Sequence, residues 1–357
     1  TARRHVGLLV PAEDGGYAPQ PGDNPHFTDQ DVQVPAHDPR DSSRSKGPTD
    51  LARCNQPVTE NESDREAFAG GILYRAAHIA GSPIGLRPEG TPVIIRAGSL
   101  AADEVEFTVS PAEDTSLPPK GVVTAALRRK FSLDLDLPAF YRFVERLPPL
   151  AQLTAQQTGL RPILKDTLLE ALCLAIIDQQ VNVSFAARLK HRLLETYGRL
   201  YQVDGHELWL FPSAEELAAL DPHALHPLQF SRSKSSYIID LARRFLAEPH
   251  WESPGGTDEE IVERLCTLRG VGRWTAEYAA MMGLGLTDTL PAADIGLMRM
   301  VQRVYGLAER PTEDQVRKIG RDWSPWRGLV TFHLWHQEDT ENASTTNATT
   351  SNNKKLG

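Results

Sequence analysis

Two stretches in the second half of the chain combine residue types that could do chemistry. Leu268-Arg-Gly-Val-Gly272 places two glycines around one small apolar residue, between two segments with helical apolar spacing. Glycine permits positive φ and close approach of another backbone, and the first N–H groups of the following helix have no partners within it. Such a hairpin suits a phosphate, or a cation shared with phosphate oxygens. The alternative is an ordinary hairpin of two helices with a glycine cap.

The second stretch, Leu290-Pro-Ala-Ala-Asp294, follows a glycine-rich break and leads into a helix that runs to Val304. An aspartate at this place is usually the cap of a helix, because its side chain accepts a hydrogen bond from the first turn. Asp294 is notable for its position after the hairpin. A cap and a reactive carboxylate are compatible roles for one side chain.

The elements that must position these residues belong to a mainly helical domain, over residues 137–338. Apolar spacing predicts helices over 168–177, 184–197 and 233–246. A Ser-x-x-Glu box at Ser213 and a Thr-x-x-Glu box at Thr257 predict two further helix starts.

A smaller α+β domain is predicted over residues 66–136. Three β-like runs, at 72–74, 93–95 and 105–109, are separated by Gly/Pro turns, and a helix follows at 121–131. Residues 1–65 are predicted to form a disordered arm, because their polar, Pro- and Gly-rich composition cannot bury enough apolar area to offset chain entropy. Residues 339–357, rich in Asn, Thr and Ser, are predicted to be a disordered tail.

Composition excludes several classes of protein. The chain has 357 residues, of which 40% are hydrophobic, and lacks an apolar run long enough to span a membrane. Three distant cysteines cannot form a disulfide framework or a four-cysteine iron–sulfur site, which fits a reducing cytoplasm. The net charge of -9 argues against a basic coat for nucleic acid but leaves local phosphate binding open. No His/Asp/Glu cluster has metal-ligand spacing, so we expect neither a cofactor nor a catalytic metal.

The hairpin and the aspartate loop together resemble the helix–hairpin–helix DNA glycosylase superfamily. Leu268–Ala276 matches that family's hairpin, and Pro291-Ala-Ala-Asp294 matches its loop ending in the catalytic aspartate. Upstream, residues 169–180 look like the family's buried helix closing on a Gln-Gln pair. Downstream, residues 323–327 and 333–335 look like the closing helices of the 3-methyladenine DNA glycosylase II branch. The resemblance covers roughly residues 160–337, and implies a helix–hairpin–helix glycosylase fold.

The resemblance implies a base-excision repair enzyme that hydrolyses the N-glycosidic bond of alkylated purines in duplex DNA. Because a duplex hides this bond, the nucleotide must be turned out of the stack. Asp294 would then stabilise the cationic transition state and orient or deprotonate water. Trp274, Tyr278 and Trp335 would line the pocket for the base, where a cationic methylated purine gains from stacking on electron-rich rings. Core packing is the alternative role for each aromatic residue.

The resemblance also implies a set of DNA contacts. Gln179 and Gln180 would act as a wedge or contact the orphan base, or else cap a loop. Independently of the resemblance, Ser231-Arg-Ser-Lys234 could hold a second phosphate by backbone N–H groups plus Arg232 or Lys234, or be a solvated helix start. A structural cation could be held at the hairpin by Leu268 and Val271. The hairpin itself would contact DNA through Gly270, Val271, Gly272 and Thr275.

Trp274 bears on the subclass. Bifunctional relatives have at this position a lysine that forms a Schiff base with the sugar, and Trp cannot be a nucleophile. A monofunctional glycosylase without lyase activity is therefore implied.

Three alternatives stay open: a glycosylase for deaminated or oxidised bases, a non-enzymatic hairpin module that binds DNA structures, and a metabolic helical enzyme with a coincidental Gly-x-Gly. The expected partner is damaged double-stranded DNA and not a membrane, and the expected state is a monomer. We expect the protein in the cytoplasm with the nucleoid if bacterial, or in the nucleus if eukaryotic.

Overall fold

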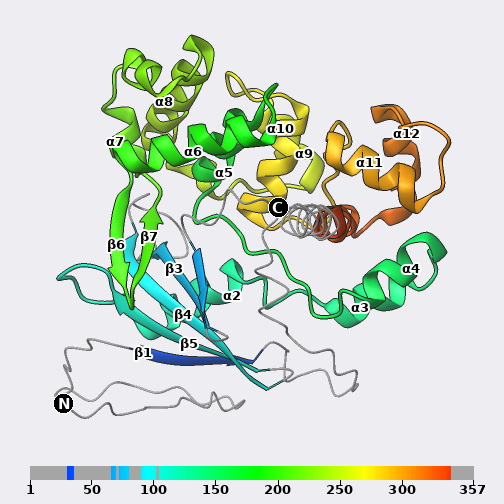
Figure 1. Cartoon of the computed structure of the whole chain (residues 1–357), viewed down its shortest axis with the longest axis horizontal. Helices are drawn as coiled ribbons and strands as arrows, with labels where there is room; N and C mark the ends of the chain where they lie inside the picture. The colour runs from blue at the N-terminus through cyan, green and yellow to red at the C-terminus, as the bar shows by residue number, and fades with distance from the viewer. Residues whose placement is uncertain (1–29, 36–65, 70–71, 80–89, 102–103, 339–357) are drawn as a thin grey trace, which may run out of the picture.

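The computed structural model describes residues 30–35, 66–69, 72–79, 90–101 and 104–338. A β-sheet with one covering helix lies on one side of the molecule, and a larger group of helices lies on the other (Figure 1). The mainly helical fold with a small α+β unit at its N-terminal side agrees with the sequence analysis. Within the described residues, no helix has the length and apolar character needed to cross a membrane.

The sheet is antiparallel, with strand order β1-β5-β4-β3-β2. Alternating residues of its strands, such as Val93, Ile95 and Phe107, face helix α2 and form a buried core with Val123 and Leu127 of that helix. Each strand presents one residue in two to this face, since side chains alternate along an extended chain. The bounds are β1 Gln30–Pro35, β2 Glu66–Ala69, β3 Ile72–Ile79, β4 Thr91–Ala101, β5 Glu104–Pro111 and α2 Lys120–Lys130.

Strand β1 lies within the segment that the sequence analysis treated as a disordered arm, so that expectation is wrong for these residues. They pair antiparallel with β5, from Gln30 opposite Val109 to Pro35 opposite Glu104. The backbone groups on the edge of β5 supply the partners that the composition of the arm did not reveal. The remainder of 1–65, and the whole of the predicted tail 339–357, lie outside the described residues.

The helical part is built around α5, in which every residue from Leu168 to Ile177 is buried. A helix that is apolar on all sides must be enclosed by others, and α5 contacts α6, α8 and α10. The capping boxes predicted at Ser213 and Thr257 are both present. The helices are α3 Leu137–Val144, α4 Pro148–Ala155, α5 Leu168–Asp178, α6 Val183–Tyr197, α7 Ala214–Ala218, α8 Arg232–Ala247, α9 Asp258–Leu265, α10 Arg273–Ala279, α11 Ile295–Val304 and α12 Glu313–Ile319.

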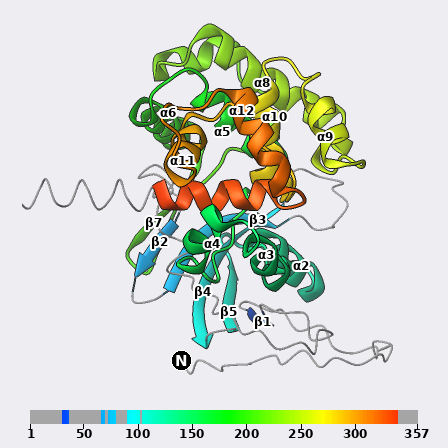
Figure 2. The ribbon, with the colours of Figure 1, turned by 90° about the vertical axis from the view of Figure 1, so that its right-hand side faces the viewer.

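A further helix over residues 327–338 runs between the two parts of the molecule (Figure 2). Its residues Leu329, Val330 and Leu334 share a core with Phe140 of α3 and Met300 of α11. We refer to it as helix 327–338. It therefore ties the element that follows Asp294 to the helices that precede α5.

A two-stranded hairpin, β6 Arg199–Val203 and β7 His206–Leu210, interrupts the helical part and was missed by the sequence analysis. Leu208 and Leu210 are fully buried against Ala76 and Ile94, on the face of the sheet opposite α2. The hairpin thus covers the second face of the N-terminal sheet. The division at residue 136 separates segments that pack together as one body.

Candidate active site and nucleic-acid interface

Asp294 stands at the start of α11 and caps it. Its Oδ1 accepts a hydrogen bond from the Leu297 backbone N–H at 2.8 Å. The residue is half-buried, so part of its carboxylate is withdrawn from water. The cap accounts for one of the hydrogen bonds that this carboxylate receives, and the others come from different helices.

Two indole N–H groups also donate to the Asp294 carboxylate. Trp335 Nε1 lies 3.0 Å from Oδ1, and Trp274 Nε1 lies 3.2 Å from Oδ2. Burial raises the pKa of the Asp294 carboxyl above its ordinary value, while the Leu297 N–H, both indoles and the charge of Arg299 act in the opposite direction. The result is a desolvated carboxylate whose orientation is fixed by α10, α11 and helix 327–338 together.

The predicted pocket aromatics form one cluster beside this carboxylate. The rings of Trp274 and Tyr278 stack with centroids 5.7 Å apart and an interplanar angle of 29°. Tyr278 and Trp335 follow at 5.9 Å with a tilt of 43°. Trp274 and Tyr278 are four residues apart and so lie on the same side of α10. The structure therefore brings Asp294, Trp274, Tyr278 and Trp335 together, and gives both indoles a second contact that the sequence did not suggest.

The two glycines of the hairpin between α9 and α10 serve different needs. Gly270 has φ +85°, and a Cβ placed there would lie 2.3 Å from Tyr237 Cγ. Gly272 is the N-cap of α10, is exposed, and would meet no protein atom within 4 Å of an added Cβ. Of these two positions, only 270 requires glycine for the packing of the protein itself. Gly272 presents an open backbone surface beside the first turn of α10.

The side chain of Gln179 holds the hairpin through two hydrogen bonds on its protein-facing side. Its Nε2 donates to the Gly270 carbonyl at 2.9 Å and to Thr275 Oγ1 at 2.8 Å. Thr275 is 2% exposed, and Val271 is also buried. The side chains of Gln179, Thr275 and Val271 therefore face into the protein, so any DNA contact of these residues would use their backbone groups, and their place in the DNA interface stays a prediction. Sequence alone left this outcome open, because a loop-capping amide was the alternative for Gln179.

Gln180, in contrast, is exposed and has φ +55°. An uncommon left-handed conformation in a non-glycine residue holds its side chain at the tip of the turn between α5 and α6. Of the Gln-Gln pair, Gln180 is the member that can reach a ligand.

Lys234 does not present its charge to solvent as predicted. Its Nζ donates to the carbonyls of Ile177 and Gln179 at 2.6 and 2.7 Å, and so satisfies the C-terminal end of α5. Burial lowers the pKa of this ammonium, and Asp178 opposes that effect. Arg232, two residues earlier, is exposed at the start of α8. The exposed side chain available for the predicted phosphate contact is therefore that of Arg232, and the contact itself stays a prediction.

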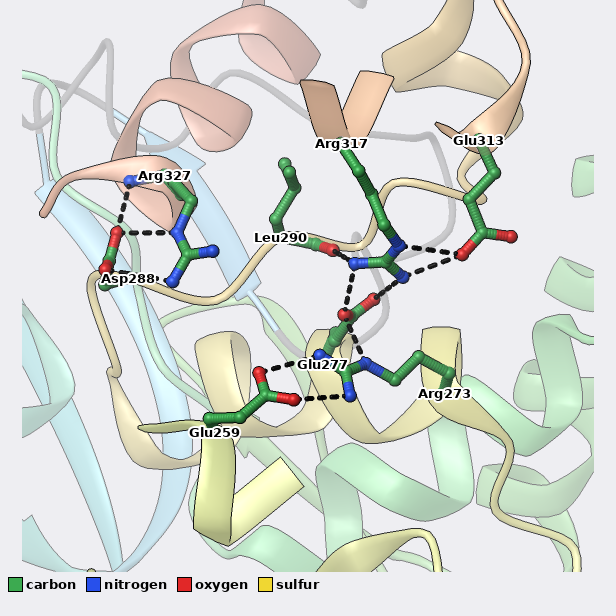
Figure 3. A network of polar contacts seen from close by, with 8 residues as sticks. All are labelled: Glu259, Arg273, Glu277, Asp288, Leu290, Glu313, Arg317 and Arg327. Carbon is green, nitrogen blue, oxygen red and sulfur yellow. Dashed lines mark hydrogen bonds and ion pairs between the residues drawn. The ribbon is translucent and has the colours of Figure 1, made fainter. Parts of the chain in front are cut away.

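A network of charged residues behind the hairpin was not identified from the sequence (Figure 3). The Glu277 carboxylate is almost fully buried and accepts from Arg273 at 2.7 Å and from Arg317 at 2.9 Å. Arg273 also pairs with Glu259 of α9 at 2.7 Å. Arg317 reaches the Leu290 carbonyl, at the start of the Asp294 loop, at 3.4 Å. The spacing of Arg273 and Glu277 at i,i+4 was the available signal.

A second ion pair fixes the chain two residues before Leu290, where it enters the same loop. Arg327 Nε and Nη2 contact the two carboxylate oxygens of Asp288 at 2.8 and 3.0 Å. Such a two-pronged pair fixes orientation as well as distance. Arg327 begins the helix on which Trp335 lies, so Asp288 links the loop before Asp294 to the helix that donates to its carboxylate.

No group of three or more His, Cys, Asp or Glu side chains is placed to hold a metal within the described part of the chain. The cation predicted at Leu268 and Val271 would use backbone carbonyls. In the structure the Leu268 carbonyl accepts the Val271 N–H at 3.1 Å. That site stays a prediction.

Comparison with known proteins agrees with this geometry. Residues 173–325 match the HhH-GPD superfamily of base excision DNA repair proteins. A DNA-3-methyladenine glycosylase of Bacillus subtilis is 34% identical over 209 residues, which are 57% of this chain and 68% of the relative. DNA-3-methyladenine glycosylase 2 of Escherichia coli is 33% identical over 190 residues, 53% of this chain and 64% of that protein.

Solved structures share the fold. A 3-methyladenine DNA-glycosylase from Archaeoglobus fulgidus superposes with a TM-score of 0.70 at 21% identity, covering 86% of this chain and 98% of that one. An 8-oxoguanine glycosylase/lyase from Clostridium acetobutylicum, in complex with DNA, gives 0.62 at 15% identity, covering 82% and 92%. The chain belongs to the HhH-GPD superfamily of base excision DNA repair proteins, as its hairpin and aspartate loop indicated.

Proposed function

We propose that this protein is a monofunctional DNA glycosylase of base-excision repair, which releases alkylated bases of the 3-methyladenine and 7-methylguanine type from duplex DNA. The observation that supports it best is the Asp294 carboxylate held by the indoles of Trp274 and Trp335 beside the aromatic cluster. The names of the Bacillus subtilis and Escherichia coli relatives support the same substrate class.

Hydrolysis of an N-glycosidic bond builds positive charge on the sugar as the base departs. A fixed carboxylate stabilises that charge without having to reorganise during the reaction. Leu297, Trp274 and Trp335 already donate to both oxygens of Asp294, so few acceptor positions remain on the carboxylate to take a proton from water. Its main contribution is therefore electrostatic, and the attacking water is oriented by the oxygen lone pairs that remain.

Selection of the base follows from the aromatic cluster. A methylated purine with a positive ring is attracted to the face of an indole or phenol more than a neutral base is. Tyr278 lies between the two tryptophans, so a base placed on this cluster would meet π-faces close to the Asp294 carboxylate. Alkylated bases are favoured for this reason over the deaminated or oxidised bases considered above.

Two observations on where lysines lie support the absence of lyase activity. Position 274 is Trp where a Schiff-base enzyme would need an amine. Lys234, the lysine nearest to the hairpin on its N-terminal side in sequence, has its ammonium held by two backbone carbonyls. The likeness in fold to a glycosylase/lyase does not bear on this point, because the two chains are 15% identical.

Contact with DNA is assigned to exposed groups near the hairpin. Gly272 and the first N–H groups of α10 would meet one phosphate. Arg232 would meet a second, and Gln180 would enter the gap left by the displaced nucleotide. Local contacts of this kind account for DNA binding by a chain whose net charge is -9.

The test is to incubate the protein with methylated duplex DNA and identify the released bases by mass spectrometry. Duplexes with a single hypoxanthine or 8-oxoguanine serve as the alternative substrates. Release of 3-methyladenine and 7-methylguanine by the wild type supports the proposal. Release of only deaminated or oxidised bases would contradict it, and so would binding of the DNA without release of any base.

A further inference from the structure

Helix 327–338 places a second carboxylate near Asp294. Glu338 follows Trp335 by three residues and so lies on the same side of that helix. Its side chain is 10% exposed, and Oε1 accepts from Arg299 Nε of α11 at 2.7 Å. The helix thus presents to α11 both an indole donor and an acid.

Gly296 separates the two acids. A Cβ at position 296 would lie 2.5 Å from Glu338 Oε2 and 3.1 Å from Asp294 Oδ1. The two carboxylates therefore flank one Cα, and any side chain at 296 would have to displace Glu338. Its φ is not in the left-handed region, so close approach explains the glycine better than backbone conformation does.

We propose that Glu338 is a positioning residue for Asp294, acting across Gly296, and that Arg299 is the cation that the two carboxylates share. The inference rests on the proposed catalytic role of Asp294. The groups that face Asp294 are the Leu297 N–H and Arg299 of α11, the indole of Trp274 on α10, and Trp335 and Glu338 of helix 327–338.

The sign of each effect follows from electrostatics. Like charges at close range favour protonation of one partner, and a nearby cation favours ionisation. Removal of Arg299 leaves two uncompensated carboxylates, so Asp294 should accept a proton at a higher pH. Removal of the Glu338 charge leaves Arg299 to Asp294 alone, so protonation should require a lower pH.

Because Trp274 and Trp335 donate to Asp294, their indole N–H signals report its ionisation without any reaction. We would follow these two resonances by 15N–1H NMR against pH in the full chain, assigned with Trp→Phe variants. Arg299→Ala should raise the midpoint by about one pH unit. Glu338→Gln should lower it, and the double variant should lie closer to the wild type than Arg299→Ala does. Arg303→Ala, one turn later on α11, is the matched control and should leave the midpoint unchanged.

Single-turnover excision of 7-methylguanine against pH is the second measurement. The acidic limb should move in the same direction and order as the NMR midpoints. Equal midpoints in the wild type and Arg299→Ala, or a shift equally large in Arg303→Ala, would overturn the inference even if excision is normal. Shifted midpoints with an unmoved acidic limb would also overturn it. If the wild type releases no base, the proposed function fails, while the NMR comparison still decides whether Glu338 and Asp294 are coupled.

Discussion

Trp335 Nε1 donates to Asp294 Oδ1 at 3.0 Å across 41 positions of sequence. The same oxygen caps α11 through Leu297. A helix cap and an indole donor thus converge on one atom, which makes the direction of the carboxylate a property of two helices. Changes to either helix should therefore be visible in the chemistry at Asp294.

Asp294→Asn should lower single-turnover excision by about 100-fold or more, because an amide cannot offset charge on the sugar. DNA affinity, measured by fluorescence anisotropy, should change little. Asp136→Asn is the matched control, since Asp136 caps α3 in the same way through the Ala139 N–H at 2.8 Å. A loss of binding as large as the loss of excision would identify Asp294 as a structural cap only.

Trp335→Phe keeps an aromatic ring and removes the indole donor. A hydrogen bond to a charged group is worth about 1.5–3 kcal/mol, so excision should fall by roughly 10- to 100-fold. Loss of a donor also disfavours the ionised carboxyl, so the acidic limb of the excision profile should move to higher pH. Trp326→Phe, whose indole makes no contact with Asp294 in the described structure, is the comparison. An unmoved limb in Trp335→Phe would show that the bond does not affect Asp294.

The two hairpin glycines should respond differently to alanine. Gly270→Ala forces a Cβ into the Tyr237 ring at positive φ, and should cost at least about 2 kcal/mol of unfolding free energy. Gly272→Ala should leave thermal stability nearly intact but weaken DNA binding, because its Cβ meets no protein atom. Equal losses of stability in the two variants, measured by calorimetry, would contradict the different roles of the two glycines. A Gly272→Ala variant that binds DNA as tightly as the wild type would show that Gly272 is not part of the interface.

No covalent adduct should be trapped by borohydride with an alkylated duplex, and strand scission should appear only after added alkali. Lys234→Met should lower the melting temperature, because the end of α5 loses its donor, without changing the products. An adduct present in the wild type and absent in Lys234→Met would make the enzyme bifunctional through an unexpected lysine.

His333 gives a pH dependence to stability. It is fully buried beside Phe140, Nδ1 pairs with Gln157 Oε1 at 2.7 Å, and burial lowers its pKa to about 3. The imidazole of the unfolded chain binds a proton near pH 6.5, whereas that of the folded chain does not. The free energy of unfolding is therefore highest above pH 6.5 and decreases as the pH falls. By pH 5 the free energy of unfolding should be lower by about 2 kcal/mol. His333→Leu should flatten this slope in denaturant titrations, whereas exposed His223→Leu should not.

Much of the fold could be predicted because its signals are local. The apolar run of α5, the capping boxes and the alternation in β3–β5 each identify an element without knowledge of its neighbours. The hairpin β6–β7 also had a local signal, Asp204-Gly205, and both residues adopt positive φ as its tight turn requires. Strand β1 had none of comparable strength, since its stability depends on the edge of β5.

The sequence could predict which residues belong to the candidate site, but not which partners their side chains contact. Motif spacing pointed to Asp294 and the aromatic residues, yet side-chain partners depend on which helices meet. Lys234 could have faced solvent or the end of α5, and Gln179 could have faced DNA or the hairpin. Glu338 and Arg299 are distant in sequence, so their pairing near Asp294 follows only from the placement of helix 327–338.

The hairpin β6–β7 has a consequence for how this chain can be divided. Leu208 and Leu210 belong to the helical part by sequence and to the sheet by contact. A fragment that begins after residue 136 would expose both leucines, and the sheet alone would have an uncovered apolar face. Fragments made at that boundary should therefore aggregate, and the glycosylase and the β-unit should be expressed, evolved or transplanted only as a single piece.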